Sequence, residues 1–153
     1  MGRALSPLTR WSRIVGMADI RPPITVDLTW DGDLCFSGTS AATSMILDGK
    51  STAGPSPMQA IAYGLAGCMA IDVVNVLTRG RHPLRGLKAH LVGERADDEP
   101  RRFVAMTLHY VVQGNVPADA VARAIQLSRD KYCSVWHSLR QDITFSVTHT
   151  IEA

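Results

Sequence analysis

The stretch SPMQAIAYGLAGCMAIDVVNVLTRG, residues 56–80, predicts one long helix around which the rest of the chain is arranged. Ser56, with Gln59 three residues later, matches a capping box, in which each side chain bonds the other residue's backbone N–H. Pro57 suits the first helical position, and Gly80 is a typical helix end. Both ends of the helix are therefore specified by the local sequence.

The interior of this stretch is apolar on all sides. Asp72 is its only charged residue before Arg79, which is typical of a helix buried on most of its surface. Cys68 lies near the middle, and the small residues Gly64 and Gly67 would let a substrate approach its sulfur. The simplest interpretation is a packed, unreactive thiol. A thiolate here would need a stabilising group other than the helix dipole, and Asp72 would oppose it unless protonated or paired.

Alternating and hairpin patterns predict the remaining elements. Residues Ile24 to Trp30 alternate apolar and polar side chains, and Asp31-Gly32 is a dipeptide favoured in two-residue hairpin turns. The further expected elements are strands at 34–36, 44–47, 86–95, 102–113 and 143–149, a helix opened by Pro117 and a short helix over 134–140. This order predicts an α+β domain with antiparallel hairpins, and its apolar long helix favours a dimer that buries it.

Length and composition favour one globular domain. The chain has 153 residues, of which 46% are hydrophobic and 20% charged, and a net charge of +2 spread along its length. This charge does not favour nucleic-acid binding. The widely spaced Cys35, Cys68 and Cys133 do not fit a secreted disulfide framework, so we expect a cytoplasmic protein. The apolar run 60–71 is short for a membrane span, so we expect no membrane association.

The first twenty residues differ in character from the rest. They carry Arg3, Arg10 and Arg13 with no acidic residue before Asp19, and they lack the apolar segment of a secretory signal. We expect residues 1–20 to be a disordered extension and residues 21–153 to form the single domain.

The second helix-associated thiol is Cys133, which is expected just before a short helix and close to Lys131. A helix N-terminus and a nearby cation can lower a thiol pKa, although a capping or packing role is the alternative. Two thiols on two helices are also what a peroxidatic and resolving pair requires, in which one attacks a peroxide and the other condenses with the sulfenic acid.

Several motifs resemble the OsmC/Ohr family, that is, osmotically inducible protein C and organic hydroperoxide resistance protein. The resemblance covers roughly residues 24–152. Within the family, the chain is similar in particular to the OsmC-like branch of obscure function. It rests on Gly54-Pro55-Ser56-Pro57-Met58, on Leu65-Ala66-Gly67-Cys68-Met69-Ala70-Ile71-Asp72-Val73-Val74, on Gly93-Glu94-Arg95, and on Lys131-Tyr132-Cys133-Ser134-Val135.

The resemblance implies an OsmC-like fold, with antiparallel sheets around a long central helix, in an intertwined homodimer. It further implies a thiol-dependent peroxidase that reduces small organic hydroperoxides and is regenerated by a dithiol reductant. Cys68 would be the peroxidatic thiolate and Cys133 the resolving thiol, joined in a disulfide during turnover. No cofactor and no metal are expected.

The sequence departs from the family at two positions that hold the thiolate. The first hairpin lacks the arginine of well-studied members, and Met58 stands where they have a glutamate that orients it. Candidate replacements are Arg21, Arg95, Arg101 and Arg102, among which we expect Arg95 because it belongs to a shared motif.

Two other interpretations remain open at this point. The missing arginine and glutamate favour a non-catalytic OsmC-like dimer that binds a small apolar ligand in the interface cleft. The spacing of Cys133 and His137 would also suit two metal ligands on one helix face, with Cys68 as a third.

Overall fold

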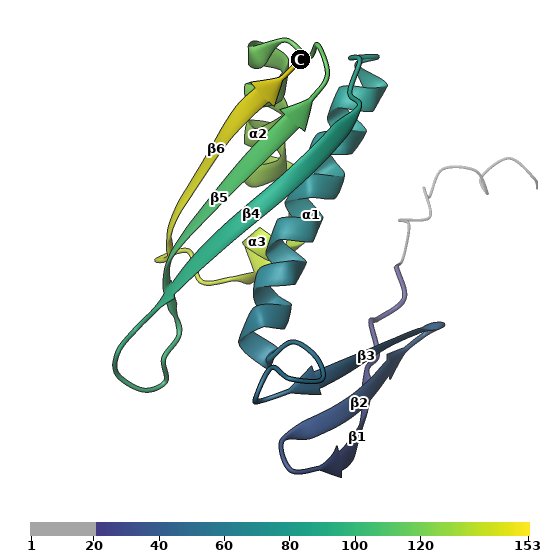
Figure 1. Cartoon of the computed structure of the whole chain (residues 1–153), viewed down its shortest axis with the longest axis vertical. Helices are drawn as coiled ribbons and strands as arrows, with labels where there is room; N and C mark the ends of the chain where they lie inside the picture. The colour runs from purple at the N-terminus through teal and green to yellow at the C-terminus, as the bar shows by residue number, and fades with distance from the viewer. Residues whose placement is uncertain (1–20) are drawn as a thin grey trace, which may run out of the picture.

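The structure, a computed structural model, describes residues 21–153 (Figure 1). The expected disordered extension, residues 1–20, lies outside the described residues. Two three-stranded sheets are joined by the long helix α1, Pro57–Arg79. The first sheet contains β1 (Asp27–Gly32), β2 (Cys35–Ser40) and β3 (Thr43–Asp48). The second sheet contains β4 (Gly86–Arg95), β5 (Phe103–Gln113) and β6 (Thr144–Glu152). Between β5 and β6 the chain forms α2 (Ala118–Leu127), the π-helical turn η1 (Ser128–Tyr132) and α3 (Ser134–Ser138).

The ends of α1 match the sequence prediction. Ser56 Oγ accepts a hydrogen bond of 3.3 Å from the Gln59 backbone N–H, and the Ser56 N–H donates to Gln59 Oε1 at 2.8 Å. At the other end the Gly80 N–H donates to the Val76 carbonyl at 3.0 Å. The capping box satisfies two N–H groups that a helix N-terminus otherwise leaves without a partner, which confirms the predicted boundary.

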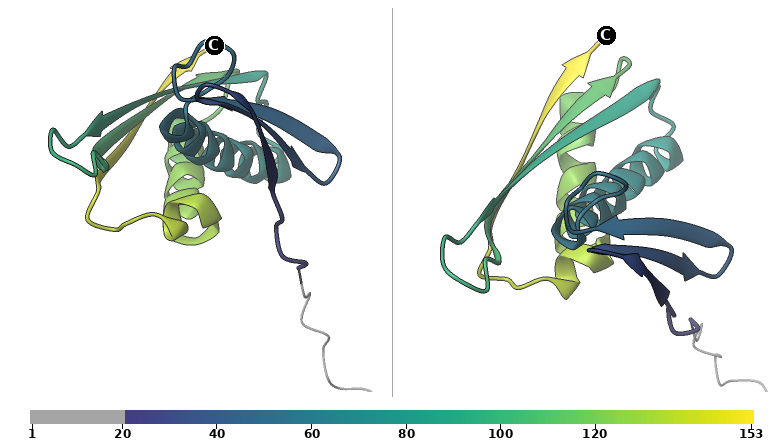
Figure 2. Two further views of the ribbon diagram at one scale, coloured as in Figure 1. Left: turned by 90° about the horizontal axis from the view of Figure 1, so that it is seen from below. Right: turned by 60° about the horizontal axis from the view of Figure 1, so that its bottom comes forward.

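The core lies between α1, α2 and one face of the second sheet. Figure 2 shows both helices on the same face of β4–β5–β6. A single stripe of α1 side chains is fully buried there, in one hydrophobic cluster with alternate residues of β5, the central strand. The buried stripe is Leu65, Met69, Val73 and Leu77, and the β5 members of the cluster include Met106, Leu108, Tyr110 and Val112.

The expectation that α1 is buried on most sides is wrong for the single chain. Its opposite side leaves Tyr63 71% and Ile71 63% exposed. One sheet and α2 can cover only one side of a helix, and the first sheet lies beside its N-terminal end (Figure 1). The uncovered side therefore exposes large apolar side chains that a partner could cover.

The α+β class with two sheets and a long helix is confirmed, but the second sheet is mixed. β4 pairs with β5 antiparallel, whereas β6 pairs with β5 in parallel. The chain between β5 and β6 passes through α2, η1 and α3, and such a helical crossover allows the next strand to run in the same direction.

The first hairpin turn is two residues later than the sequence pattern suggests. Gly32 still pairs with Cys35, so the turn is formed by Asp33 and Leu34, and the pairing shifts register between Trp30 and Gly32. Gly32 has a φ of 109°, a conformation that a residue with a side chain rarely adopts. The register shift leaves Asp31 without a paired residue in β2, as in a β-bulge.

Candidate functional site

Tertiary folding brings Cys68 and Cys133 together from distant parts of the chain. Cys68 projects from the middle of α1, and Cys133 lies between η1 and α3. The two sulfur atoms and a carboxylate oxygen of Asp72 all lie within 4.8 Å of one another. Asp72 is on the same helix, one turn after Cys68, so these two groups face the same side of α1.

Cys133 forms hydrogen bonds with the backbone of residues before and after it. Its N–H donates to the Ser128 carbonyl at 2.8 Å, and its sulfur accepts a hydrogen bond of 3.3 Å from the Trp136 N–H. The side chain is fully buried. The thiol therefore caps α3 from inside the core.

The pKa of Cys133 is raised to about 11, contrary to the lowered value expected from its position. Burial is the largest cause, the adjacent Cys68 and Asp72 groups add to it, and only the Trp136 N–H opposes it. Lys131, the expected stabilising cation, lies over the Tyr132 ring at 5.5 Å instead. Desolvation of the thiolate thus outweighs the favourable helix N-terminus.

Asp72 is hydrogen-bonded to a buried hydroxyl. Ser128 Oγ donates to Asp72 Oδ2 at 2.8 Å, and Ser128 is fully buried. The partner of Asp72 is therefore a neutral hydroxyl, and the carboxylate lies close to both thiols. Sequence reasoning identified the need for a partner but not this one.

Tyr110 is a further group of the site that sequence reasoning missed. Its hydroxyl is buried and has no hydrogen-bond partner within residues 21–153. Burial raises its pKa far above the ordinary value, and the nearby Cys133, Asp72 and Cys68 add to this. Tyr110 thus presents a neutral O–H close to all three groups. The only signal in the sequence is a hydroxyl on the otherwise apolar, core-facing side of the strand Phe103–Gln113.

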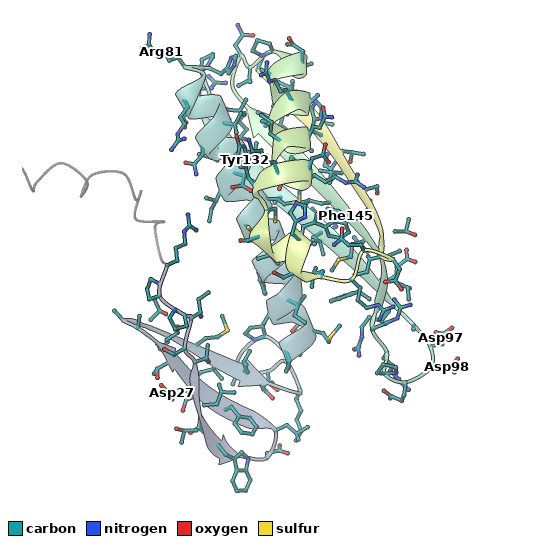
Figure 3. All side chains as sticks on the ribbon, turned by 180° about the vertical axis from the view of Figure 1, so that it is seen from behind. Asp27, Arg81, Asp97, Asp98, Tyr132 and Phe145 are labelled. Atoms are coloured by element: carbon teal, nitrogen blue, oxygen red, sulfur yellow. The ribbon has the colours of Figure 1, made fainter. Side chains whose placement is uncertain are left out.

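An open cleft of about 610 Å³ gives access to Cys68. Cys68 and Asp72 line it, together with two arginines, Arg21 and Arg79. Tyr132 contributes to the same wall, and Figure 3 shows it on the turn beside α1. Cys133 is absent from the lining and lies behind Cys68, so the two thiols differ in exposure.

Arg95 does not line this cleft. Its Nε donates to the Arg101 carbonyl at 2.6 Å, at the base of the β4–β5 loop. Figure 3 shows the tip of that loop, marked by Asp97 and Asp98, projecting away from the helices. The other candidates also have partners of their own, since Arg101 pairs with Glu99 and Arg102 with Asp142. Of the four arginines considered from the sequence, only Arg21 lines the Cys68 cleft.

The other candidate side chains lie elsewhere. His137 is exposed on α3 and is not part of the group formed by the two cysteines and Asp72. Cys35 lies in β2, in the first sheet. Neither contributes to the site around Cys68.

Helix α1 is long and apolar enough to cross a membrane by length and composition, with a mean hydropathy of 1.8 over its most apolar window. The core helix of a soluble protein meets the same criterion. Here the helix carries Asp72 in a hydrogen bond to a neighbouring element, and four of its residues are fully buried in the core. These contacts favour the core helix.

Comparison with known proteins identifies the family. A family model described as OsmC-like protein matches residues 48–148. Protein YhfA of Escherichia coli K12 is 41% identical over 126 residues, which are 80% of this chain and 92% of YhfA.

Solved structures share the fold. A hypothetical protein from Aquifex aeolicus superposes with a TM-score of 0.80 at 23% identity, covering 86% of this chain and 98% of the other. An organic hydroperoxide resistance protein OsmC from Legionella pneumophila superposes with a TM-score of 0.64 at 12% identity, covering 84% and 97%. Together with the family match and the similarity to YhfA, these comparisons establish that the chain belongs to the OsmC-like family.

Proposed function

We propose that this protein is a thiol peroxidase that reduces small organic hydroperoxides in the cytoplasm. One observation carries the proposal: Cys68 lines an open cleft, and the buried Cys133 sulfur lies within 4.8 Å of the Cys68 sulfur. A peroxidatic thiol must meet its substrate, whereas a resolving thiol needs to meet only the sulfenic acid. Structural neighbours that bear the name organic hydroperoxide resistance protein support the same activity.

The reaction proceeds in two steps at Cys68. Its thiolate attacks one peroxide oxygen, the O–O bond breaks, and the alkoxide leaves and takes up a proton to become an alcohol. Cys68 is then a sulfenic acid. The Cys133 sulfur displaces its hydroxyl, forming the Cys68–Cys133 disulfide and releasing water. A dithiol reductant returns both residues to thiols and is itself oxidised to a disulfide.

The cleft arginines replace the family's hairpin arginine in this proposal. Arg21 and Arg79 line the same cleft as Cys68, and neither forms an ion pair with another residue of the described chain. A guanidinium that approaches the sulfur would favour the thiolate. Arg95 is engaged with a carbonyl at the β4–β5 loop, so its proposed role passes to these two residues.

Asp72 and Tyr110 complete the site by handling protons and charge. A carboxylate this close to a thiol can accept its proton and return it to the departing alkoxide. The Tyr110 hydroxyl has no hydrogen-bond partner among residues 21–153, so it can donate to negative charge that develops on sulfur or oxygen.

We further propose that the active form is a homodimer. The first sheet exposes a continuous apolar face, formed by cross-strand neighbours in β1, β2 and β3, and the uncovered side of α1 is also apolar. The exposed residues on the sheet face include Leu28, Trp30, Phe36 and Met45. A second copy of the chain is the partner that would cover such surfaces in a stable protein.

The decisive experiment measures consumption of cumene hydroperoxide with dihydrolipoamide as reductant, in the presence of a metal chelator. We expect turnover in the wild type, and loss of roughly a thousandfold or more in Cys68→Ser because the nucleophile is gone. The Cys133→Ser variant should accumulate a sulfenic acid on Cys68, which dimedone traps. The matched control is Cys35→Ser, whose turnover rate should equal that of the wild type. Equal turnover in wild type and Cys68→Ser would refute the proposal.

The alternative is a non-catalytic OsmC-like dimer that binds a small apolar ligand beside Cys68. The raised pKa of Cys133 and the absence of a hairpin arginine favour it. It predicts no peroxide turnover and no sulfenic acid in any variant, so the same experiment separates the two functions.

A further inference from the structure

We infer that Cys68, Asp72 and Cys133 form a binding site for a thiophilic divalent cation such as Zn²⁺ in the reduced protein. This inference departs from the expectation of no metal, and it uses Asp72 in place of the His137 that the sequence spacing suggested. It does not depend on peroxidase activity, because it concerns the reduced thiols alone.

The donor set suits zinc. Two sulfurs and a carboxylate oxygen lie within 4.8 Å of one another. Zinc binds thiolate sulfur at about 2.3 Å and carboxylate oxygen at about 2.0–2.2 Å, so tetrahedral ligands lie roughly 3.5–3.8 Å apart. A small inward rotation of these side chains is enough to enclose an ion. A mixed sulfur and oxygen set also excludes Mg²⁺ and Ca²⁺, which prefer oxygen ligands alone.

Two of the three ligands already have supporting hydrogen bonds. The Ser128 hydroxyl donates to Asp72 Oδ2 at 2.8 Å, which leaves Oδ1 available. The Trp136 N–H donates to the Cys133 sulfur at 3.3 Å, and such a bond also stabilises a metal thiolate. Contacts of this kind orient metal ligands and commonly change metal affinity by about 10- to 100-fold.

The surroundings leave room for a fourth ligand, and an unsatisfied donor lies nearby. Cys68 and Asp72 line the open cleft, so the remaining coordination position can be reached by water or by a small ligand. The nearby Tyr110 hydroxyl is fully buried and has no hydrogen-bond partner in the described part of the chain, so it is a free donor beside the cluster.

Metal and disulfide exclude each other at this site. Binding of Zn²⁺ displaces one proton from each thiol, whereas a Cys68–Cys133 disulfide removes both sulfur ligands. The site therefore binds the cation only when the pair is reduced, and a bound cation blocks attack by Cys68 on any oxidant.

The test uses metal-free, reduced full-length protein titrated with Co²⁺ as a spectroscopic probe, followed by displacement with Zn²⁺. We expect one equivalent per chain, with a thiolate-to-cobalt absorption band in the near ultraviolet that Zn²⁺ abolishes. Cys68→Ser and Cys133→Ser should lose this band, and Asp72→Asn should weaken binding by at least about tenfold. Cys35→Ser, the matched control, should bind as the wild type does.

A second measurement needs no substitution. Wild-type protein oxidised to the disulfide should lose the cobalt band, and a non-chelating phosphine reductant should restore it. Binding that lacks the thiolate band, persists in Cys68→Ser or survives oxidation would overturn the inference, and so would the absence of binding by reduced wild type. Peroxide turnover, measured with chelator present, is unaffected by either result, so the two proposals fail separately.

Discussion

The Ser128 hydroxyl donates a 2.8 Å hydrogen bond to the Asp72 carboxylate and joins η1 to the middle of α1. Ser128 is fully buried, whereas Asp72 also faces the Cys68 cleft. The same serine accepts the Cys133 N–H through its carbonyl. One residue therefore positions both the carboxylate and the second thiol.

Replacing Ser128 by Ala should destabilise the fold by about 1–3 kcal/mol, because a bond to a partly buried charge is lost. Urea unfolding of the reduced protein measures this, and Ser134→Ala, at an exposed serine on the neighbouring helix, is the control. If the bond matters, Ser128→Ala should lower the free energy of unfolding by much less in an Asp72→Ala background, where the acceptor is already gone. Additive effects in this double-mutant cycle would contradict the coupling.

The two site thiols should differ in their reaction with an aromatic disulfide such as dithionitrobenzoate. In Cys35→Ser protein, Cys68 should react first because it lines the cleft, and the nearby Cys133 should then displace the reagent. Each chain would release two equivalents of chromophore and end with a Cys68–Cys133 disulfide. Adding Cys133→Ser should reduce the release to one equivalent. A stable mixed disulfide in the Cys35→Ser protein would mean that the sulfurs cannot meet.

The free energy of unfolding should fall in alkaline solution because the buried Cys133 thiol resists ionisation. Its pKa is raised to about 11 in the folded protein, against about 8.5 for an unfolded thiol. Above about pH 8.5 the Cys133 thiol loses its proton in the unfolded state but keeps it in the folded state. The free energy of unfolding therefore falls as the pH rises from about 8.5 toward 11. Unfolding under reducing conditions should show a shallower alkaline decline in Cys133→Ser. An identical slope in both proteins would exclude the buried neutral thiol as the cause.

A charge on the apolar face of the first sheet should disrupt the proposed dimer. Met45 is 52% exposed on that face, whereas its neighbour Ser44 points to the opposite side of the same strand. Because Met45 is exposed in the single chain, Met45→Glu should leave the monomer folded and weaken association by about 2 kcal/mol or more, roughly 30-fold. Sedimentation would measure this, with Ser44→Glu as the control. Wild-type protein that sediments as a monomer, or equal association in both variants, would contradict the dimer.

Much of the fold could be predicted because its signals are local. The capping box at Ser56 and Gln59 and the alternation in β4 and β5 act through hydrogen bonds and side chains only a few residues apart. These elements appear where the sequence predicts them, and the family motifs around Cys68 and Cys133 are local as well. The parallel pairing of β6 was missed because strand direction depends on the path of the whole crossover.

The sequence by itself determined the elements, the family and the two thiols, since each is written in consecutive residues. Only the tertiary structure decided their surroundings: Asp72 and Ser128 are 56 positions apart, and Tyr110 lies on a third element. It also placed Arg21 and Arg79, but not Arg95, around the Cys68 cleft. The physical reason is that hydrogen bonding, desolvation and charge act across space, so a group's chemistry follows from the elements that pack around it rather than from its neighbours along the chain.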